Sequence, residues 1–187
     1  MTRHGENTMR RIVFAGIALT TLVAGVAQAQ HAPTRRKIVE AIEIDAAADK
    51  VWAVVGNVKD SSWVERVVGT REDGDDPAVS TRTLTLGSGR TLVEKGRRYD
   101  AARRSLAYYI TSNDVRDLPA GDYSATISVQ PEGTDRAKVE WNAAFYRGYP
   151  NINPPPELND ENSEKAVRAW VHASLENLKA RVEKGGS

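Results

Sequence analysis

Two oppositely charged residues, Arg82 and Glu94, occupy positions that a β-hairpin would bring side by side. Residues 87–89, with the sequence Gly-Ser-Gly, form the expected loop between two stretches of alternating apolar and polar residues. With this loop, Leu84 lies opposite Leu92, and by the same register Arg82 lies opposite Glu94. The charged pair then shares the apolar face, where a charge must be paired or solvated. We interpret it as a buried ion pair that fixes the hairpin or as a polar anchor for a ligand; a shifted register would expose both side chains.

Aromatic side chains are expected to surround this pair, because strand alternation and helix periodicity direct them to the same interior. These residues are Tyr108, Tyr123, Trp141, Phe145 and Trp170. An aromatic wall with one polar pair is typical of a small-molecule pocket, but the same residues also suit an ordinary packed core. Together with Arg82 and Glu94, they are the candidate residues of a ligand cavity.

Other residues with catalytic potential are sparse. His172 is the only histidine of the expected folded part, and no serine, acid or metal-ligand pattern accompanies it. Because the chain has no cysteine, thiolate chemistry and disulfides are excluded. The sequence therefore predicts no catalytic residue, no metal and no cofactor. Residues 146–154, rich in tyrosine and proline, are either an exposed binding loop or a rigid connector.

The first 29 residues resemble a secretory signal peptide. Arg10 and Arg11 precede an uncharged apolar run at 12–26, and Ala27-Gln28-Ala29 fits the small-x-small cleavage pattern. Cleavage there removes three of the 26 basic and one of the 25 acidic residues, which leaves a net charge of −1. This balance argues against a nucleic-acid partner. We expect export to the periplasm, no membrane anchor after cleavage, and a flexible arm at 30–37.

The remaining chain predicts an α+β domain over residues 38–183, followed by a tail at 184–187. Strands are expected at 38–44, 64–70, 79–86, 90–99, 104–111, 122–130 and 136–147, with turns frequent enough for an antiparallel meander. A short helix follows the first strand and ends near residue 56, and a second short helical turn is expected at 59–63. From Val167 to Val182, apolar residues recur at helical spacing, which predicts a long amphipathic helix at 158–182 that packs on the sheet.

The order of several segments is similar to that of the START-like superfamily, which includes birch pollen allergens and the polyketide cyclase/dehydrase group. These segments are DAAADKVW at 45–52, RTLTL at 82–86, VEKG at 93–96, RSLAYYI at 104–110 and LPAGDYSATISV at 118–129, followed by the long helix. The resemblance implies a helix-grip fold: a curved seven-stranded antiparallel sheet around the C-terminal helix, with two short helices after the first strand. It also implies a cavity between sheet and helix.

Within that superfamily, residues 153–179 resemble the MxaD-type periplasmic proteins of bacterial methanol oxidation. The resemblance implies a non-enzymatic accessory factor whose partner is a periplasmic dehydrogenase or its cytochrome. We therefore expect an exported, non-catalytic accessory or binding protein. Two alternatives use the cavity: a carrier for a small apolar ligand, or a cyclase- or hydratase-type enzyme in which Arg82, Glu94 and Tyr108 act on a substrate.

Overall fold

The computed structural model describes Met1 and residues 32–185. The expected signal peptide, its cleavage site and the last two residues lie outside the described residues.

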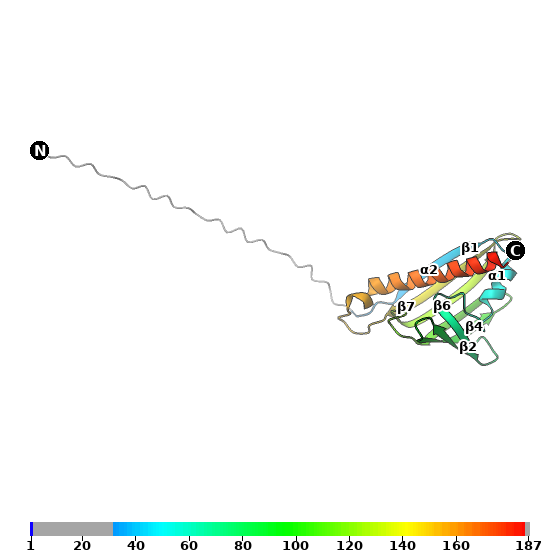
Figure 1. Ribbon diagram of the computed structural model, residues 1–187, viewed down its shortest axis with the longest axis horizontal. Coiled ribbons are helices and arrows are strands. Elements are labelled where there is room, and N and C mark those ends of the chain that lie inside the picture. The colour runs from blue at the N-terminus through cyan, green and yellow to red at the C-terminus, as the bar shows by residue number, and fades with distance from the viewer. Residues whose placement is uncertain (2–31, 186–187) are drawn as a thin grey trace.

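A seven-stranded antiparallel sheet forms the body of the domain (Figure 1). Its strands are β1 (Arg36–Ile44), β2 (Val67–Asp73), β3 (Thr81–Leu86), β4 (Thr91–Asp100), β5 (Ser105–Ser112), β6 (Ala120–Pro131) and β7 (Ala137–Arg147). Strands β2 to β7 pair in sequence order as a meander, and β1 pairs with β7, so that the spatial order is β1-β7-β6-β5-β4-β3-β2. Register shifts within β2, β4 and β6 interrupt the ladders. Such bulges bend strands and increase their twist, which suits a sheet that curves around a helix.

The long helix α2 (Asp160–Lys184) packs against β1, β7 and the short helix α1 (Ala48–Val55). Figure 1 shows it running along one face of the sheet, after the one-turn 3-10 helix η1 (Pro156–Leu158). The side chain of Asn159 accepts a hydrogen bond from the backbone N–H of Asn162 at 2.8 Å, which caps the first turn. The expected apolar stripe is buried: Val167, Trp170, Val171, Leu175, Leu178 and Val182. The predicted helix-grip architecture is confirmed.

The prediction of a second short helix at residues 59–63 is wrong. Residues 57–66 form separate turns, in which the backbone N–H groups of Asp60 and Val64 bond to carbonyls three residues earlier. The side chains of Asn57 and Asp60 accept backbone N–H groups two residues further along the chain. These local bonds compete with helical hydrogen bonding, which explains why the segment does not continue as a helix.

Glycine is required at position 96 in β4, because the backbone of Pro77 and Ala78 comes very close to it. A Cβ at this position would lie 2.4 Å from the carbonyl oxygen of Pro77. The backbone N–H of Gly96 donates to the Ser80 carbonyl at 2.9 Å. Residues 77–80 therefore lie directly against β4 at this point, and a side chain at position 96 would collide with them.

Candidate functional site

The hairpin of β3 and β4 brings Arg82 and Glu94 together as predicted. Leu84 pairs with Leu92 and Arg82 pairs with Glu94 in the ladder. The loop at residues 87–89 closes through a hydrogen bond from the Leu86 N–H to the Arg90 carbonyl, 2.9 Å long. Gly89 has φ +80°, a conformation that glycine adopts without strain. The loop chemistry thus sets the register that places both charges on the inner face.

The two charges form a buried ion pair. Nη2 of Arg82 lies 2.9 Å from Oε2 of Glu94, and the side chains are 8% and 5% exposed. Burial raises the pKa of Glu94 above its ordinary value, while the positive charge of Arg82 acts in the opposite direction. The Cζ atom of Arg82 also lies 5.2 Å from the ring centre of Tyr108. The guanidinium therefore contacts both a carboxylate and an aromatic face, and both contacts attract its positive charge.

The aromatic candidates form a contiguous buried cluster. Tyr123 lies 6.3 Å from Tyr108, 6.0 Å from Phe145 and 6.4 Å from Trp170, measured between ring centres. The indole N–H of Trp141 donates to the Tyr123 hydroxyl at 3.1 Å. Burial raises the pKa of both tyrosine hydroxyls, so each remains a protonated donor at neutral pH.

The space left among these side chains is small. A cavity of about 20 Å³ is lined by Arg82, Glu94, Tyr108 and Trp141, together with residues of α1 and of the following turns. This volume holds roughly one water molecule. Tyr123, Phe145 and Trp170 do not line it, although they lie in the same core. The seven candidates are therefore one neighbourhood, of which four residues border the remaining space.

Asn57 and Ser61 also border this cavity, although the sequence did not single them out. Both belong to the turns after α1, and Ser61 is buried. In the sequence, polar residues in a short connecting segment suggest a solvated turn. Their observed position against the core results from the packing of the whole segment. No local sequence signal indicates it.

A second buried ion pair joins the end of β7 to the start of α2. Nη1 of Arg147 lies 3.4 Å from Oδ2 of Asp160. Arg147 also donates to the carbonyls of Tyr149 and Asn151, at 2.9 and 2.6 Å. Strand alternation places Arg147 on the same face as Phe145, and this signal could have found it. The loop at 146–154 is thus fixed at its start by contacts with buried charges.

The remaining candidate, His172, lies on the surface. Its side chain is 66% exposed, and its Nε2 atom is 3.9 Å from a carboxylate oxygen of Glu176. It does not approach the cavity. Within residues 32–185, no three histidine, cysteine, aspartate or glutamate side chains gather as a metal site. In the same part of the chain, no helix has the length and apolarity that a membrane span requires.

The sheet, the long helix and the enclosed polar pair define the chain as a START-like protein of the helix-grip type. Residues 35–183 match the family described as polyketide cyclase / dehydrase and lipid transport. The chain belongs to this family. No curated protein sequence matches it.

Solved structures share the fold at low sequence identity. Zhui aromatase/cyclase from Streptomyces sp. R1128 is 17% identical with a TM-score of 0.66, covering 82% of this chain and 97% of its own. XoxI from Bacillus cereus is 19% identical with a TM-score of 0.66, covering 81% and 98%. Truncated norcoclaurine synthase from Thalictrum flavum is 19% identical with a TM-score of 0.61, covering 82% and 96%. The fold thus occurs in proteins of different activities, and likeness at this identity shows the fold alone.

Proposed function

We propose that this chain is a non-catalytic accessory protein that acts by binding a protein partner through its surface. The observation that carries the proposal is the small size of the cavity beside Arg82 and Glu94, which measures about 20 Å³. Ligand sites commonly measure about 300–1,000 Å³, so the cavity beside this pair is too small for a substrate in this state.

The charges of the interior support the same proposal. Arg82 could polarise a carbonyl, but its guanidinium faces Glu94 at 2.9 Å. Glu94 could act as a base, but its nearest charged neighbour is this same guanidinium. Each group satisfies the other, and this arrangement is expected of an ion pair that stabilises the hairpin.

The finer proposal is that the protein is exported and assists a periplasmic alcohol dehydrogenase and its cytochrome. It is supported by the cleavage pattern at residues 27–29 and by the resemblance of residues 153–179 to the MxaD-type proteins. The likeness to XoxI adds only a shared fold, because the two chains are 19% identical.

A pull-down of the mature protein from periplasmic extract tests the proposal. We expect a dehydrogenase or a cytochrome to be retained by the folded protein and not by the affinity tag alone. Mass spectrometry of the exported protein should show a chain that begins near Gln30. An intact N-terminus in the periplasmic fraction would refute export by cleavage, and retention of no partner would refute the accessory role.

The second candidate function is a carrier or cyclase-type enzyme that opens the same interior. It is favoured by one observation: Arg82, Glu94 and Tyr108 all border the residual cavity. A stoichiometric rise in melting temperature with a small aromatic or apolar probe would support it. Val55→Trp, which would fill the cavity border, should then abolish the rise. Without such a rise, the accessory role remains the better account.

A further inference from the structure

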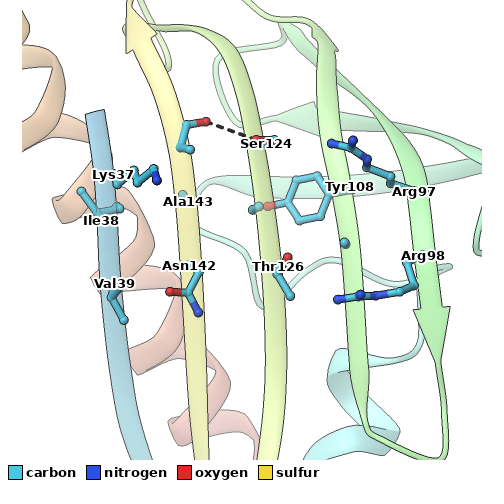
Figure 2. A pocket seen from close by; sticks show the side chains of 13 residues that line it. Lys37, Ile38, Val39, Arg97, Arg98, Tyr108, Ser124, Thr126, Asn142 and Ala143 are labelled. Carbon is cyan, nitrogen blue, oxygen red and sulfur yellow. Dashed lines mark hydrogen bonds between the residues drawn. The ribbon is translucent and has the colours of Figure 1, made fainter. Parts of the chain in front are cut away.

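A broad groove crosses the face of the sheet opposite α2. It measures about 480 Å³ and is lined by residues of β1, β7, β6, β5 and β4. Figure 2 shows these strands with helical segments behind them, so the groove lies on the side that the helix does not cover. It lies on the other face of the sheet from Arg82 and Glu94, and Tyr108 of β5 borders both the groove and the inner cavity.

The floor of the groove consists of small side chains. Ala107, Ser124, Thr126, Asn142 and Ala144 occupy its three middle strands. Small residues at consecutive outward positions leave a hollow between the longer side chains at the margins. Ser124 already bonds Arg35 and the Ala144 carbonyl, and the Asn142 amide donates to Glu140. The amide oxygen of Asn142 and the hydroxyl of Thr126 can still hydrogen-bond an extended backbone.

The two margins of the groove carry positive charge. Lys37 on β1 borders one side, and Arg97 and Arg98 on β4 border the other. The register shift between Gly96 and Arg98 is a bulge, which explains how two consecutive arginines reach the same margin. Figure 2 shows both arginines extending towards β5. No carboxylate lines the groove.

These three cations are not neutralised within the domain. Other outward arginines have acidic neighbours: Arg35 lies 3.4 Å from Asp122, and Arg71 lies 3.2 Å from Asp73. Among the described residues, Lys37, Arg97 and Arg98 form no such pair. The groove is thus a site of uncompensated positive charge with a polar floor.

We propose that this groove binds an extended acidic segment of a protein partner. Strands are about 4.8 Å apart, so four steps from β1 to β4 separate the two charged margins by roughly 19 Å. A small anion cannot contact both margins, whereas about six residues of extended peptide span this distance. Arg35 of the chain itself donates to the floor residue Ser124 at 3.2 Å, but residues 32–36 carry no carboxylate, so their charge does not complement the two margins. The inference rests on the proposed function, since it names the surface through which the accessory role would operate.

The test uses the mature protein and a fluorescent peptide of about ten residues in which Glu and Ser alternate. We expect saturable binding at low ionic strength that weakens with added salt. The triple variant Lys37→Gln, Arg97→Gln, Arg98→Gln should bind about tenfold more weakly, because it loses several exposed charge contacts. Thr126→Tyr keeps every charge but fills the floor, and it should weaken binding as well.

The matched control removes the same charge elsewhere. Lys50, Lys59 and Lys165 are exposed and lie outside the groove, so their joint change to Gln should leave binding unchanged. Equal loss in both triple variants, or no loss with Thr126→Tyr, would overturn the proposal. Groove-dependent binding of heparin or phosphatidylglycerol vesicles in preference to the peptide would also overturn it. So would self-association that the groove variant abolishes, because the occupant would then be a second copy.

The two proposals fail separately. A partner retained equally by the wild type and by the groove variants would overturn the groove and leave the accessory role standing. If the groove binds the peptide but no partner is retained from periplasmic extract, the accessory role is overturned and the groove remains a peptide-binding site.

Discussion

The guanidinium of Arg82 lies 2.9 Å from the carboxylate of Glu94, inside the core and beside the ring of Tyr108. Neither side chain is appreciably exposed to bulk water. Each charge therefore offsets most of the free-energy cost of removing the other from water. Removal of one partner leaves a buried charge without its counter-ion, which costs more than the pair contributes.

Single replacements of this pair should be strongly destabilising, and the double replacement should cost less than their sum. We expect Arg82→Met and Glu94→Leu each to lower the free energy of unfolding by about 3–5 kcal/mol. The double variant removes both charges and should be close to the milder single variant. Urea unfolding of the four proteins measures the coupling. Additive effects with both singles near zero would show that the pair is solvated in solution.

A second prediction concerns pH and the contact between the turns after α1 and the end of α2. Arg181 lies 2.7 Å from a carboxylate oxygen of Asp60. This contact, together with hydrogen bonds from Ser62, lowers the pKa of that carboxyl from 3.8 to about 2. Because the folded pKa is below the unfolded one, the stabilisation is present above about pH 4. It is lost as the pH falls towards 2.

We therefore expect Asp60→Asn to be destabilising at pH 6, with a difference from wild type that shrinks as the pH is lowered. The side chains are about 40% exposed, so the effect should be below about 1 kcal/mol. Thermal unfolding at a series of pH values measures it. Asp75→Asn, in an exposed position without an ion pair among the described residues, is the control. A difference that grows towards acid pH would contradict the assignment.

The sequence was sufficient for the features that local periodicity controls. The loop at residues 87–89 set the register of Arg82 against Glu94, and the helical spacing from Val167 to Val182 identified the buried face of α2. A one-residue slip would have moved every strand side chain to the other face, and it would have rotated the helical stripe by about 100°. The correct positions therefore follow from strong patterns.

Features that depend on distant segments were not predictable in this way. The groove combines Lys37 on the first strand with Arg97 and Arg98 on the fourth, which become neighbours of one surface only when β1 joins β7. The size of the cavity depends on how completely the side chains pack, and composition does not determine this. The helical turn expected at residues 59–63 does not form, because the side chains of Asn57 and Asp60 bind backbone N–H groups and compete with helical hydrogen bonding.

The third prediction is that Arg147 fixes the connection between β7 and α2. The side chains of Arg147 and Asp160 are 2% and 8% exposed, and the arginine also holds two carbonyls of the following loop. Arg147→Met should cost about 3–5 kcal/mol and accelerate amide hydrogen exchange in residues 148–159. Arg103→Met is the matched control, since its arginine is 86% exposed beside Asp100. Similar losses in both variants would show that the buried contacts contribute little.

The fourth prediction concerns Trp170, which attaches α2 to the sheet. Its ring lies 5.6 Å from Trp141 and 6.4 Å from Tyr123, and its indole N–H donates to the Glu65 carbonyl at 3.3 Å. Trp170 is buried, so Trp170→Ala would leave a large void in the core. Because the surrounding rings can relax only partly, we expect a loss of about 3–5 kcal/mol in the free energy of unfolding.

The control for this change is Trp52→Ala on α1. Trp52 is half-buried, and its ring is tilted by 40° against Tyr99 with the ring centres 5.4 Å apart, so the same chemical change should cost less there. Urea unfolding monitored by circular dichroism measures both variants without relying on tryptophan fluorescence. A loss below about 1 kcal/mol for Trp170→Ala, the range of ordinary surface substitutions, would mean that α2 does not close the core. The interior would then be open to ligands, and the carrier or cyclase-type function would become the better account of this protein.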